Sequence, residues 1–243
     1  MKLAAFDLET AKVLPERVDD IKRYAPLGIS CAALAFSDGR APITWKGMPQ
    51  MSPLECQDLV RDLQRMVREG YTLLTWNGCA FDFEVVAQES GLVEECAALA
   101  LDHVDLMLIV TFTKGWYVSL EKALQGAGIA GKVKALTLSD GTRIHDMAGS
   151  KAPQLWAQGE HAAVLEYLTA DVTQLLELAK VVSERKEIRW QANTGRPQSV
   201  ALPRFLTVRE CFGIPEPDVS WMTDPPTRAQ FVSWMPAGQR RGL

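Results

Sequence analysis

The first ten residues contain an apolar strand that carries two acids. Residues 3–10 read Leu-Ala-Ala-Phe-Asp-Leu-Glu-Thr, which has the length and apolar content of a buried strand. Asp7 and Glu9 are two positions apart, so both carboxylates point to the same face of the strand. Two like charges at a desolvated sheet edge repel each other unless a cation lies between them. The pair alone is compatible with a divalent-metal site or with a strand end at which both acids emerge into water.

The composition is that of an ordinary globular protein. The chain has 243 residues and a hydrophobic fraction of 47%, which suffices for one large domain or for one domain with an appendage. No apolar stretch approaches membrane-spanning length, and Met1-Lys2 leads into the first strand without a signal-peptide pattern. We therefore expect a soluble, cytoplasmic protein without a membrane partner. The five cysteines form no C-x-x-C pair, which argues against a disulfide framework and a zinc site.

The charge distribution divides the chain. The net charge is −4, but residues 1–179 hold 16 basic and 24 acidic side chains, whereas residues 180–243 hold 10 and 6. These counts give −8 for the first part and +4 for the second. Bound cations can offset an acidic metal site, and a basic tail can bind phosphate groups. A tail that is simply solvated explains the same charge equally well.

Alternating strand and helix patterns predict an α/β fold. Strands are expected at residues 3–9, 29–37, 43–45 and 71–76, and helices at 53–67, 80–89, near 119–125 and from about 160 to 187. A meander of strands followed by helices indicates a mixed sheet flanked by helices. Seven prolines lie between Gly195 and Leu243. The expected organisation is therefore a domain over residues 1–190 and an irregular appendage over 191–243.

A further acid follows the strand expected at residues 71–76. The chain turns at Asn77-Gly78, and Asp82 falls in the first turn of the next expected helix. This position faces the strand ends, where ligands gather in sheet proteins. Asp82 could instead only complement the helix dipole, which is a common use of an acid at that place.

A tyrosine and an acid share one face of the long helix expected from about residue 160. Tyr167 and Asp171 are four residues apart, so the phenol lies next to whatever the carboxylate binds. Of the four tyrosines, only Tyr167 has an aspartate four residues later. A solvent-facing Asp171 beside a half-buried Tyr167 is the alternative for such a pair taken alone.

The three acidic segments together resemble a known set of motifs. Their order and spacing are similar to the motifs of the DEDD (DnaQ-like) 3′-to-5′ exonuclease superfamily, over about residues 1–185: Phe6-Asp7-Leu8-Glu9-Thr10, Asn77-x-x-x-Phe81-Asp82 and Tyr167-x-x-x-Asp171. The similarity is greatest to the tyrosine (DEDDy) branch, which includes the proofreading exonuclease domain of family B DNA polymerases. The histidine branch has a histidine five residues before the last aspartate, where this chain has Glu166.

The resemblance implies an RNase H-like fold and two Mg²⁺ or Mn²⁺ ions, for which carboxylate oxygens are suitable ligands. The implied metal ligands are Asp7, Glu9, Asp82 and Asp171. Tyr167 would position the attacking water. A phenol with a pKa of about 10 is a poor base at neutral pH, so we expect orientation rather than proton removal. The implied substrate contacts are Thr10, Asn77 and Phe81.

The implied activity is metal-dependent, 3′-to-5′ hydrolysis of single-stranded DNA to nucleoside 5′-monophosphates. A ribonuclease that trims RNA 3′ ends is an alternative, since the motifs specify the cleavage chemistry but not the sugar. A non-catalytic docking module for nucleic acid or protein is a further alternative, but such modules usually lack one of the four carboxylates. The expected partner is nucleic acid, with DNA favoured over RNA. The chain would act alone or be recruited by replication or repair proteins.

Other residues are candidates for the site or for substrate binding. Two clusters contain metal-ligand types, although strand or loop edges are the simpler interpretation: Asp102-His103-x-Asp105 and His145-Asp146. Trp116 and Tyr117 could stack an unpaired base or pack in the core. The basic residues that could meet phosphates or simply be solvated are Lys132, Lys134, Arg185, Lys186, Arg189, Arg196, Arg204 and Arg209.

Overall fold

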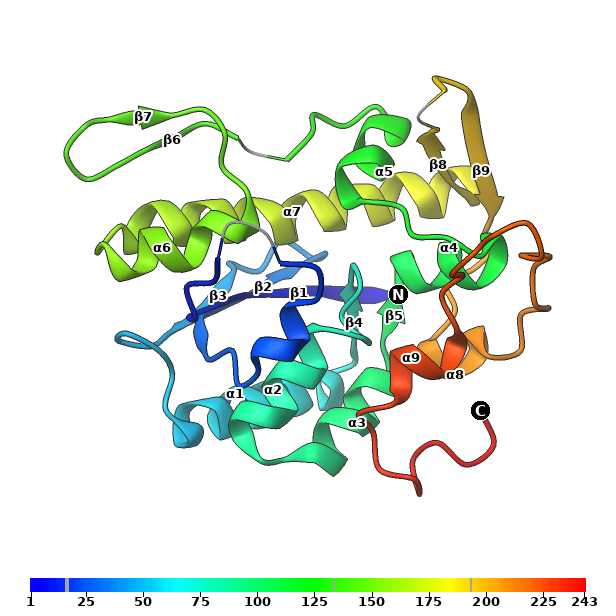
Figure 1. The fold of residues 1–243 in the computed structure, drawn as a ribbon, viewed down its shortest axis with the longest axis horizontal. Coiled ribbons are helices and arrows are strands. Elements are labelled where there is room, and N and C mark those ends of the chain that lie inside the picture. The colour runs from blue at the N-terminus through cyan, green and yellow to red at the C-terminus, as the bar shows by residue number, and fades with distance from the viewer. Residues whose placement is uncertain (16–17, 133, 193) are drawn as a thin grey trace.

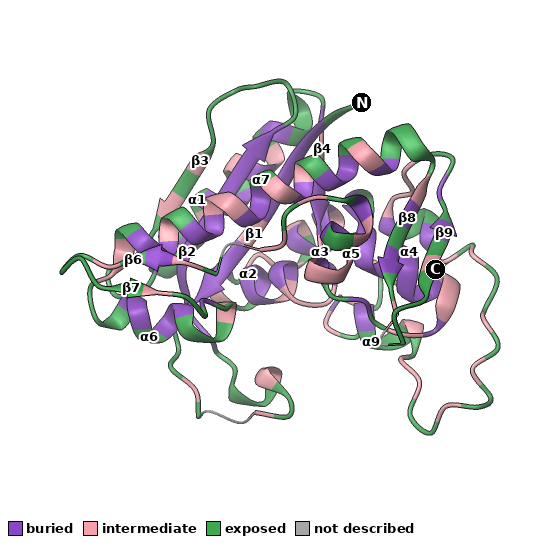
Figure 2. Cartoon of the chain, turned by 90° about the horizontal axis from the view of Figure 1, so that it is seen from above, coloured by how far each residue is buried: buried purple, intermediate pink, exposed green. Residues whose placement is uncertain are grey.

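The first three strands form an antiparallel meander in the computed structural model, which describes residues 1–15, 18–132, 134–192 and 194–243 (Figure 1). These strands are β1 (Lys2–Thr10), β2 (Ile29–Phe36) and β3 (Ile43–Lys46). All of β2 and most of β1 are buried, as Figure 2 shows, because helices cover both faces of the sheet. The strands expected at residues 3–9 and 29–37 are confirmed.

Two further strands extend the sheet in parallel. β4 (Tyr71–Thr75) pairs with β1, and β5 (Val104–Asp105) pairs with β4. The strand order is β3-β2-β1-β4-β5, so the predicted mixed sheet is confirmed. Because β1, β4 and β5 run in the same direction, their carboxyl ends meet at one edge of the sheet.

Helices lie on both faces of the sheet (Figure 1). On one face, α7 (His161–Arg185) packs against β1, β2 and β4. On the other face lie α1 (Pro53–Arg68) and α2 (Asp82–Ser90), with α3 (Val93–Asp102) beside them. The helices expected at 53–67, 80–89 and 160–187 correspond to α1, α2 and α7.

Local signals explain where these helices begin. Ser52 and Glu55 form a capping box around α1, and Pro53 occupies its first turn. α2 begins two residues later than expected because Phe81 takes the non-helical N-cap position. The apolar stretch after α2 contains α3, β5 and α4 (Leu106–Lys114). Because most side chains there are buried, no amphipathic period separates the three elements.

The remaining elements of the first 190 residues are short. They are η1 (Ile21–Tyr24), α5 (Leu120–Ala127), β6 (Leu136–Thr137), β7 (Arg143–Ile144), η2 (Gly149–Lys151) and α6 (Ala152–Ala157). β6 and β7 form a small hairpin that arches beside α7 and α6 (Figure 1). α5 confirms the helix expected near residues 119–125. No helix in the described residues is long and apolar enough to cross a membrane.

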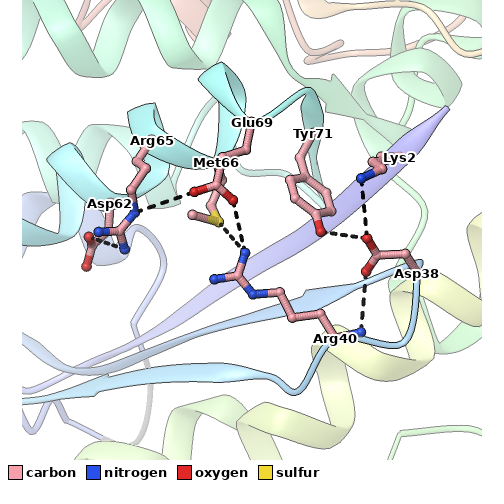
Figure 3. A network of polar contacts seen from close by, with 8 residues as sticks. All are labelled: Lys2, Asp38, Arg40, Asp62, Arg65, Met66, Glu69 and Tyr71. Carbon is pink, nitrogen blue, oxygen red and sulfur yellow. Dashed lines mark hydrogen bonds and ion pairs between the residues drawn. The ribbon is translucent and has the colours of Figure 1, made fainter.

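A polar network fixes the opposite end of the sheet from the parallel carboxyl ends (Figure 3). The hydroxyl of Tyr71 donates to Asp38 Oδ2 at 2.7 Å, and Lys2 Nζ lies 3.7 Å from the same oxygen. Arg40 joins the turn after β2 to α1, since its Nη1 lies 3.1 Å from Glu69 Oε2. The charged side chains of this network lie at the surface, so solvent screens their ion pairs.

The C-terminal segment contains short elements within irregular chain. β8 (Glu187–Gln191) and β9 (Pro197–Ala201) form a hairpin that crosses the expected boundary after residue 190. α8 (Val208–Cys211) and α9 (Arg228–Val232) follow. Phe231 is 1% exposed, and the ring of Phe112 packs edge-on against Phe212 and Phe231. Aromatic side chains therefore anchor this segment on the core.

Candidate active site

Asp7 and Glu9 lie near the carboxyl end of β1. Glu9 is 7% exposed and Asp7 is half-buried. The pairing register of β1 and β2 shifts between Glu9 and Thr10, and the hydroxyl of Ser30 donates to the Glu9 carbonyl at 3.0 Å. Such irregularities re-aim side chains next to functional sites. The predicted substrate contact Thr10 is buried at this irregularity.

A turn after β4 brings Asp82 to the same edge of the sheet. Asn77 adopts a φ of 75°, in the left-handed region. Its N–H donates to Asp105 Oδ1 at 2.9 Å, and the N–H of Cys79 donates to Asp105 Oδ2 at 3.1 Å. Asp82 then opens α2 with only 3% of its surface exposed. Phe81, the other predicted substrate contact in this motif, is half-buried against the core.

Tyr167 and Asp171 lie on the buried face of α7, which covers β1. Tyr167 is 1% exposed and Asp171 is 2% exposed. The alternative of a solvent-facing Asp171 is therefore wrong. The three segments that the sequence singles out converge, and Asp7, Glu9, Asp82 and Asp171 are called the acid cluster below.

The carboxyl groups of the acid cluster act on one another. Burial raises the pKa of Asp7, and the N–H of Leu8 donates to Asp7 Oδ1 at 3.0 Å. Burial and then the charge of Asp7 raise the pKa of Glu9 and of Asp82 well above the usual carboxyl range. Burial also raises the pKa of Asp171 to about 6. Full ionisation of the acid cluster is thus electrostatically unfavourable without added positive charge.

Lys132 brings a positive charge to the acid cluster. Its Nζ lies 2.5 Å from Asp171 Oδ2 and 5.1 Å from the centre of the Tyr167 ring. Burial by itself would lower the pKa of Lys132, but Asp171, Tyr167 and Asp7 together outweigh burial and raise that pKa. The Lys132 charge also lowers the pKa of Asp7 and Glu9. The sequence indicated Lys132 only as one of eight possible phosphate contacts.

The acids have the chemistry of a divalent-cation site. As they stand in the described residues, no three His, Cys, Asp or Glu side chains are arranged to hold a metal ion. Among the described residues, neither oxygen of Asp171 has a hydrogen-bond partner, and the Asp171 carboxylate forms an ion pair with Lys132. Asp82 Oδ1 is also buried without a hydrogen-bond partner among the described residues. Buried carboxylate oxygens that lack donors suit a hard cation such as Mg²⁺ or Mn²⁺.

The phenol of Tyr167 is held in its neutral form. Burial and then the charge of Asp171 raise its pKa above the ordinary tyrosine value. A phenol with a raised pKa can donate a hydrogen bond at neutral pH but removes a proton poorly. This direction favours the orienting role expected for Tyr167.

The two other candidate clusters remain outside the acid cluster. Nε2 of buried His103 lies 2.8 Å from Thr75 Oγ1, its Nδ1 lies 2.7 Å from the Ala100 carbonyl oxygen, and burial lowers its pKa to about 3. His103 is therefore a neutral support for β4. His145 and Asp146 are exposed, and Asp146 pairs with Lys151.

Most of the basic candidates are engaged elsewhere on the surface. Lys134 pairs with Glu121 at 3.1 Å, Arg204 with Glu210 at 2.9 Å and Arg209 with Asp102 at 3.3 Å, and Arg189 pairs with Glu187. Arg185 Nη1 lies 3.5 Å from the Gly126 carbonyl oxygen. These contacts explain part of the basic tail as structural ion pairs.

A cleft of about 630 Å³ lies beside the acid cluster. Asn77 and Lys132 line it, and Lys132 also contacts Asp171. Other walls come from residues 117–119, from the start of α5 and from α9, including Tyr117, Gln230 and Phe231. No local sequence pattern places α9 there, because its wall residues are more than 100 positions from Tyr117.

One comparison with a solved structure bears on the fold of the chain. Neither a family model nor a curated protein matches the chain. Among solved structures, a family B DNA polymerase from the archaeon Pyrobaculum calidifontis matches with a TM-score of 0.52 and 18% identity, over 74% of this chain and 24% of the polymerase. An Exonuclease I from Methylocaldum szegediense matches with a TM-score of 0.33 and 14% identity, over 76% of this chain and 41% of that enzyme. The likeness to the polymerase confirms the predicted α/β, RNase H-like fold.

Proposed function

We propose that the chain is a divalent-metal-dependent, DEDDy-type 3′-to-5′ exonuclease that releases nucleoside 5′-monophosphates from single-stranded DNA. The observation that carries the proposal is the convergence of four carboxylates from three distant segments at the carboxyl ends of the parallel strands. The fold is also similar to part of a solved structure of a family B DNA polymerase. A docking module has no need of four acids whose pKa values burial raises, so the acid cluster favours an enzyme.

Asp7, Glu9, Asp82 and Asp171 are the residues that would hold the ions. Two divalent cations there would supply Lewis acidity for phosphodiester hydrolysis. Asp171 would exchange the Lys132 ammonium for a metal ion, since the two cations would compete for the same two carboxylate oxygens. Lys132 would then be available to a phosphate of the substrate, which a lysine ammonium binds well.

Tyr167 would orient the attacking water. Its hydroxyl stays protonated at neutral pH, and its place on α7 one turn before Asp171 puts it beside the acid cluster. Asn77, at the wall of the cleft, would contact the terminal nucleotide. Thr10 and Phe81 would act through the backbone and packing that surround the acids, since both are largely covered.

Digestion of matched substrates tests the proposal. Single-stranded DNA, duplex DNA and RNA of one sequence, each labelled at the 5′ end, are incubated with Mg²⁺ or Mn²⁺ and with chelator. We expect a regular ladder that shortens from the 3′ end of single-stranded DNA and disappears with chelator or in Asp7→Asn. A ladder on RNA alone would identify a ribonuclease instead. Internal cuts only, or activity that survives chelation, would contradict the proposal.

A further inference from the structure

The cleft beside the acid cluster has an exposed aromatic ring at its wall. Tyr117 lines the cleft and is 56% exposed, although large hydrophobic side chains are mostly buried in this protein. Trp76, half-buried, lines the same cleft. Aromatic rings that face a cleft can stack unpaired bases, and such stacking tolerates any base sequence.

The loop that carries Tyr117 is held in place by its neighbours. The indole Nε1 of Trp76 donates to the Val118 carbonyl at 3.1 Å. The rings of Trp116 and Trp221 are 6.0 Å apart between centroids, with an edge-on geometry. The ring of Tyr117 lies 6.0 Å from that of Phe231 on α9. A ring that is fixed before binding loses less conformational entropy when a ligand stacks on it.

The C-terminal segment is joined to the turn that carries the predicted site residues. The indole Nε1 of Trp234 donates to the Cys79 carbonyl at 2.9 Å, and Cys79 Sγ lies 3.4 Å from the Phe231 carbonyl oxygen. α9 therefore forms a fixed wall of the cleft beside Tyr117 rather than a detached tail. The amide oxygen of Gln230 accepts the N–H of Thr227, and its NH2 group is a donor that suits a base edge.

We propose that Tyr117 and α9 form a base-binding wall for an unpaired nucleotide of the strand whose 3′ end lies at the acid cluster. This inference rests on the proposed function and specifies its substrate as unpaired at the 3′ end. Lys132 and Asn77 link the cleft to the acid cluster, so one strand can contact both. A cleft of about 630 Å³ is within the size range of sites that enclose a small organic ligand.

A double-mutant-type cycle, which combines a change of Tyr117 with removal of one base of the ligand, tests the proposed base-binding wall. Binding of a single-stranded oligonucleotide is measured by fluorescence anisotropy with Ca²⁺ in place of Mg²⁺. The ligands carry either normal bases or an abasic residue at one of the last three positions. Tyr117→Ala should weaken binding of the normal ligand about 5- to 150-fold, the range that loss of one stacked base gives. At the stacked position, the abasic ligand should bind wild type and Tyr117→Ala equally, and Tyr117→Phe should behave as wild type.

The control is Tyr24→Ala, which removes an exposed tyrosine side chain that lies outside the cleft lining. It should leave binding unchanged. A photoreactive thymine analogue at the same position should crosslink to Tyr117 or to α9. Crosslinks elsewhere, or an equal loss of affinity for the normal and the abasic ligand in Tyr117→Ala, would contradict the proposed base-binding wall. A 3′-to-5′ ladder from the wild type would still support the proposed function in that case. Wild type that neither binds nor trims any oligonucleotide would overturn both.

Discussion

Asp105 and the acid cluster lie close together, but both carboxylate oxygens of Asp105 have hydrogen-bond donors, whereas three buried oxygens of the acid cluster have none among the described residues. The Asp105 carboxylate is fully buried and accepts four backbone N–H groups at 2.9 to 3.1 Å, from Asn77, Cys79, Met107 and Leu108. In the acid cluster, Asp82 Oδ1 and both oxygens of Asp171 have no hydrogen-bond partner among the described residues, and Asp7 Oδ1 accepts the N–H of Leu8 at 3.0 Å.

The difference separates a structural acid from a ligand-binding one. Burial raises the pKa of Asp105 as it raises those of the acid cluster, so burial alone does not distinguish them. The number of hydrogen-bond donors distinguishes them, because a carboxylate that accepts four N–H groups needs no other ligand. Acids without donors destabilise the fold until a cation joins them. Asp105 therefore braces the Asn77 turn, and the acid cluster is left available for a ligand.

The largest expected effect is the loss of hydrolysis in Asp82→Asn. The substitution keeps the shape of the side chain but removes a charge from the acid cluster. We expect the rate of DNA trimming to fall at least about 10³-fold, as loss of an essential electrostatic group does. Asp38→Asn, at the opposite end of the sheet, should keep wild-type rates. Initial rates on 5′-labelled DNA give the comparison, and an Asp82→Asn rate within tenfold of wild type would remove the acid cluster from catalysis.

Asp105→Asn should mainly destabilise the fold. The amide nitrogen cannot accept a hydrogen bond, so some of the four N–H groups lose their acceptor. We expect the free energy of unfolding to fall by about 3 kcal/mol, from bonds to a charged group worth about 1.5–3 kcal/mol each. Urea denaturation in metal-free buffer measures it. The exposed acid of an ion pair serves as the control: Asp58→Asn should cost less than about 1 kcal/mol. Equal costs for the two variants would contradict the structural role of Asp105.

Tyr167→Phe should slow turnover without weakening metal binding. Loss of a group that positions a reacting water costs about 10²-fold in rate. Because the phenol has a raised pKa and stays neutral, its removal changes no ligand charge. Calorimetric titration with Mn²⁺ should return the wild-type affinity. A large loss of affinity would mean that the phenol oxygen is itself a metal ligand.

The smallest expected effect is a pH-dependent gain of stability in Glu9→Gln. The pKa of Glu9 in the folded protein is raised well above its ordinary value of 4.5. The stability that a neutral Glu9 contributes is therefore fully present below about pH 4.5 and is lost as the pH rises through the folded pKa. Glu9→Gln should match wild type at pH 4 and exceed it by on the order of 1 kcal/mol at pH 8, in metal-free buffer. A stability difference that is the same at both pH values would show that Glu9 is not held in an unfavourable charged state.

The sequence was most informative where chemistry and spacing act together. Asp7 with Glu9, Asp82 at a helix start and Tyr167 with Asp171 each had an ordinary structural explanation, but their order supported one site. The strands and long helices were predictable because a buried strand or an amphipathic helix has a local period. Within the apolar stretch before Leu108 no such period exists, so α3, β5 and α4 were not separated.

Other parts of the site depend on long-range contacts that no local pattern specifies. Asp105 looked like one acid of a weak metal cluster, and only the fold shows its four donors. Lys132 reaches Asp171 from a segment without regular structure. The bond from Trp234 to Cys79 joins residues 155 positions apart. Such contacts form because the sheet and its helices bring the segments together, which spacing in one chain does not reveal.

Thermal unfolding with and without Mn²⁺ tests the central claim most directly. The claim is that the acid cluster binds divalent cations because three of its buried carboxylate oxygens lack hydrogen-bond donors among the described residues. A cation at about 100 times its dissociation constant should stabilise the wild type by about 2.7 kcal/mol and raise its midpoint by several degrees. Asp38→Asn should show the same shift, and the double variant Asp7→Asn/Asp82→Asn should show none. An equal Mn²⁺-dependent shift in the double variant and the wild type would contradict the account.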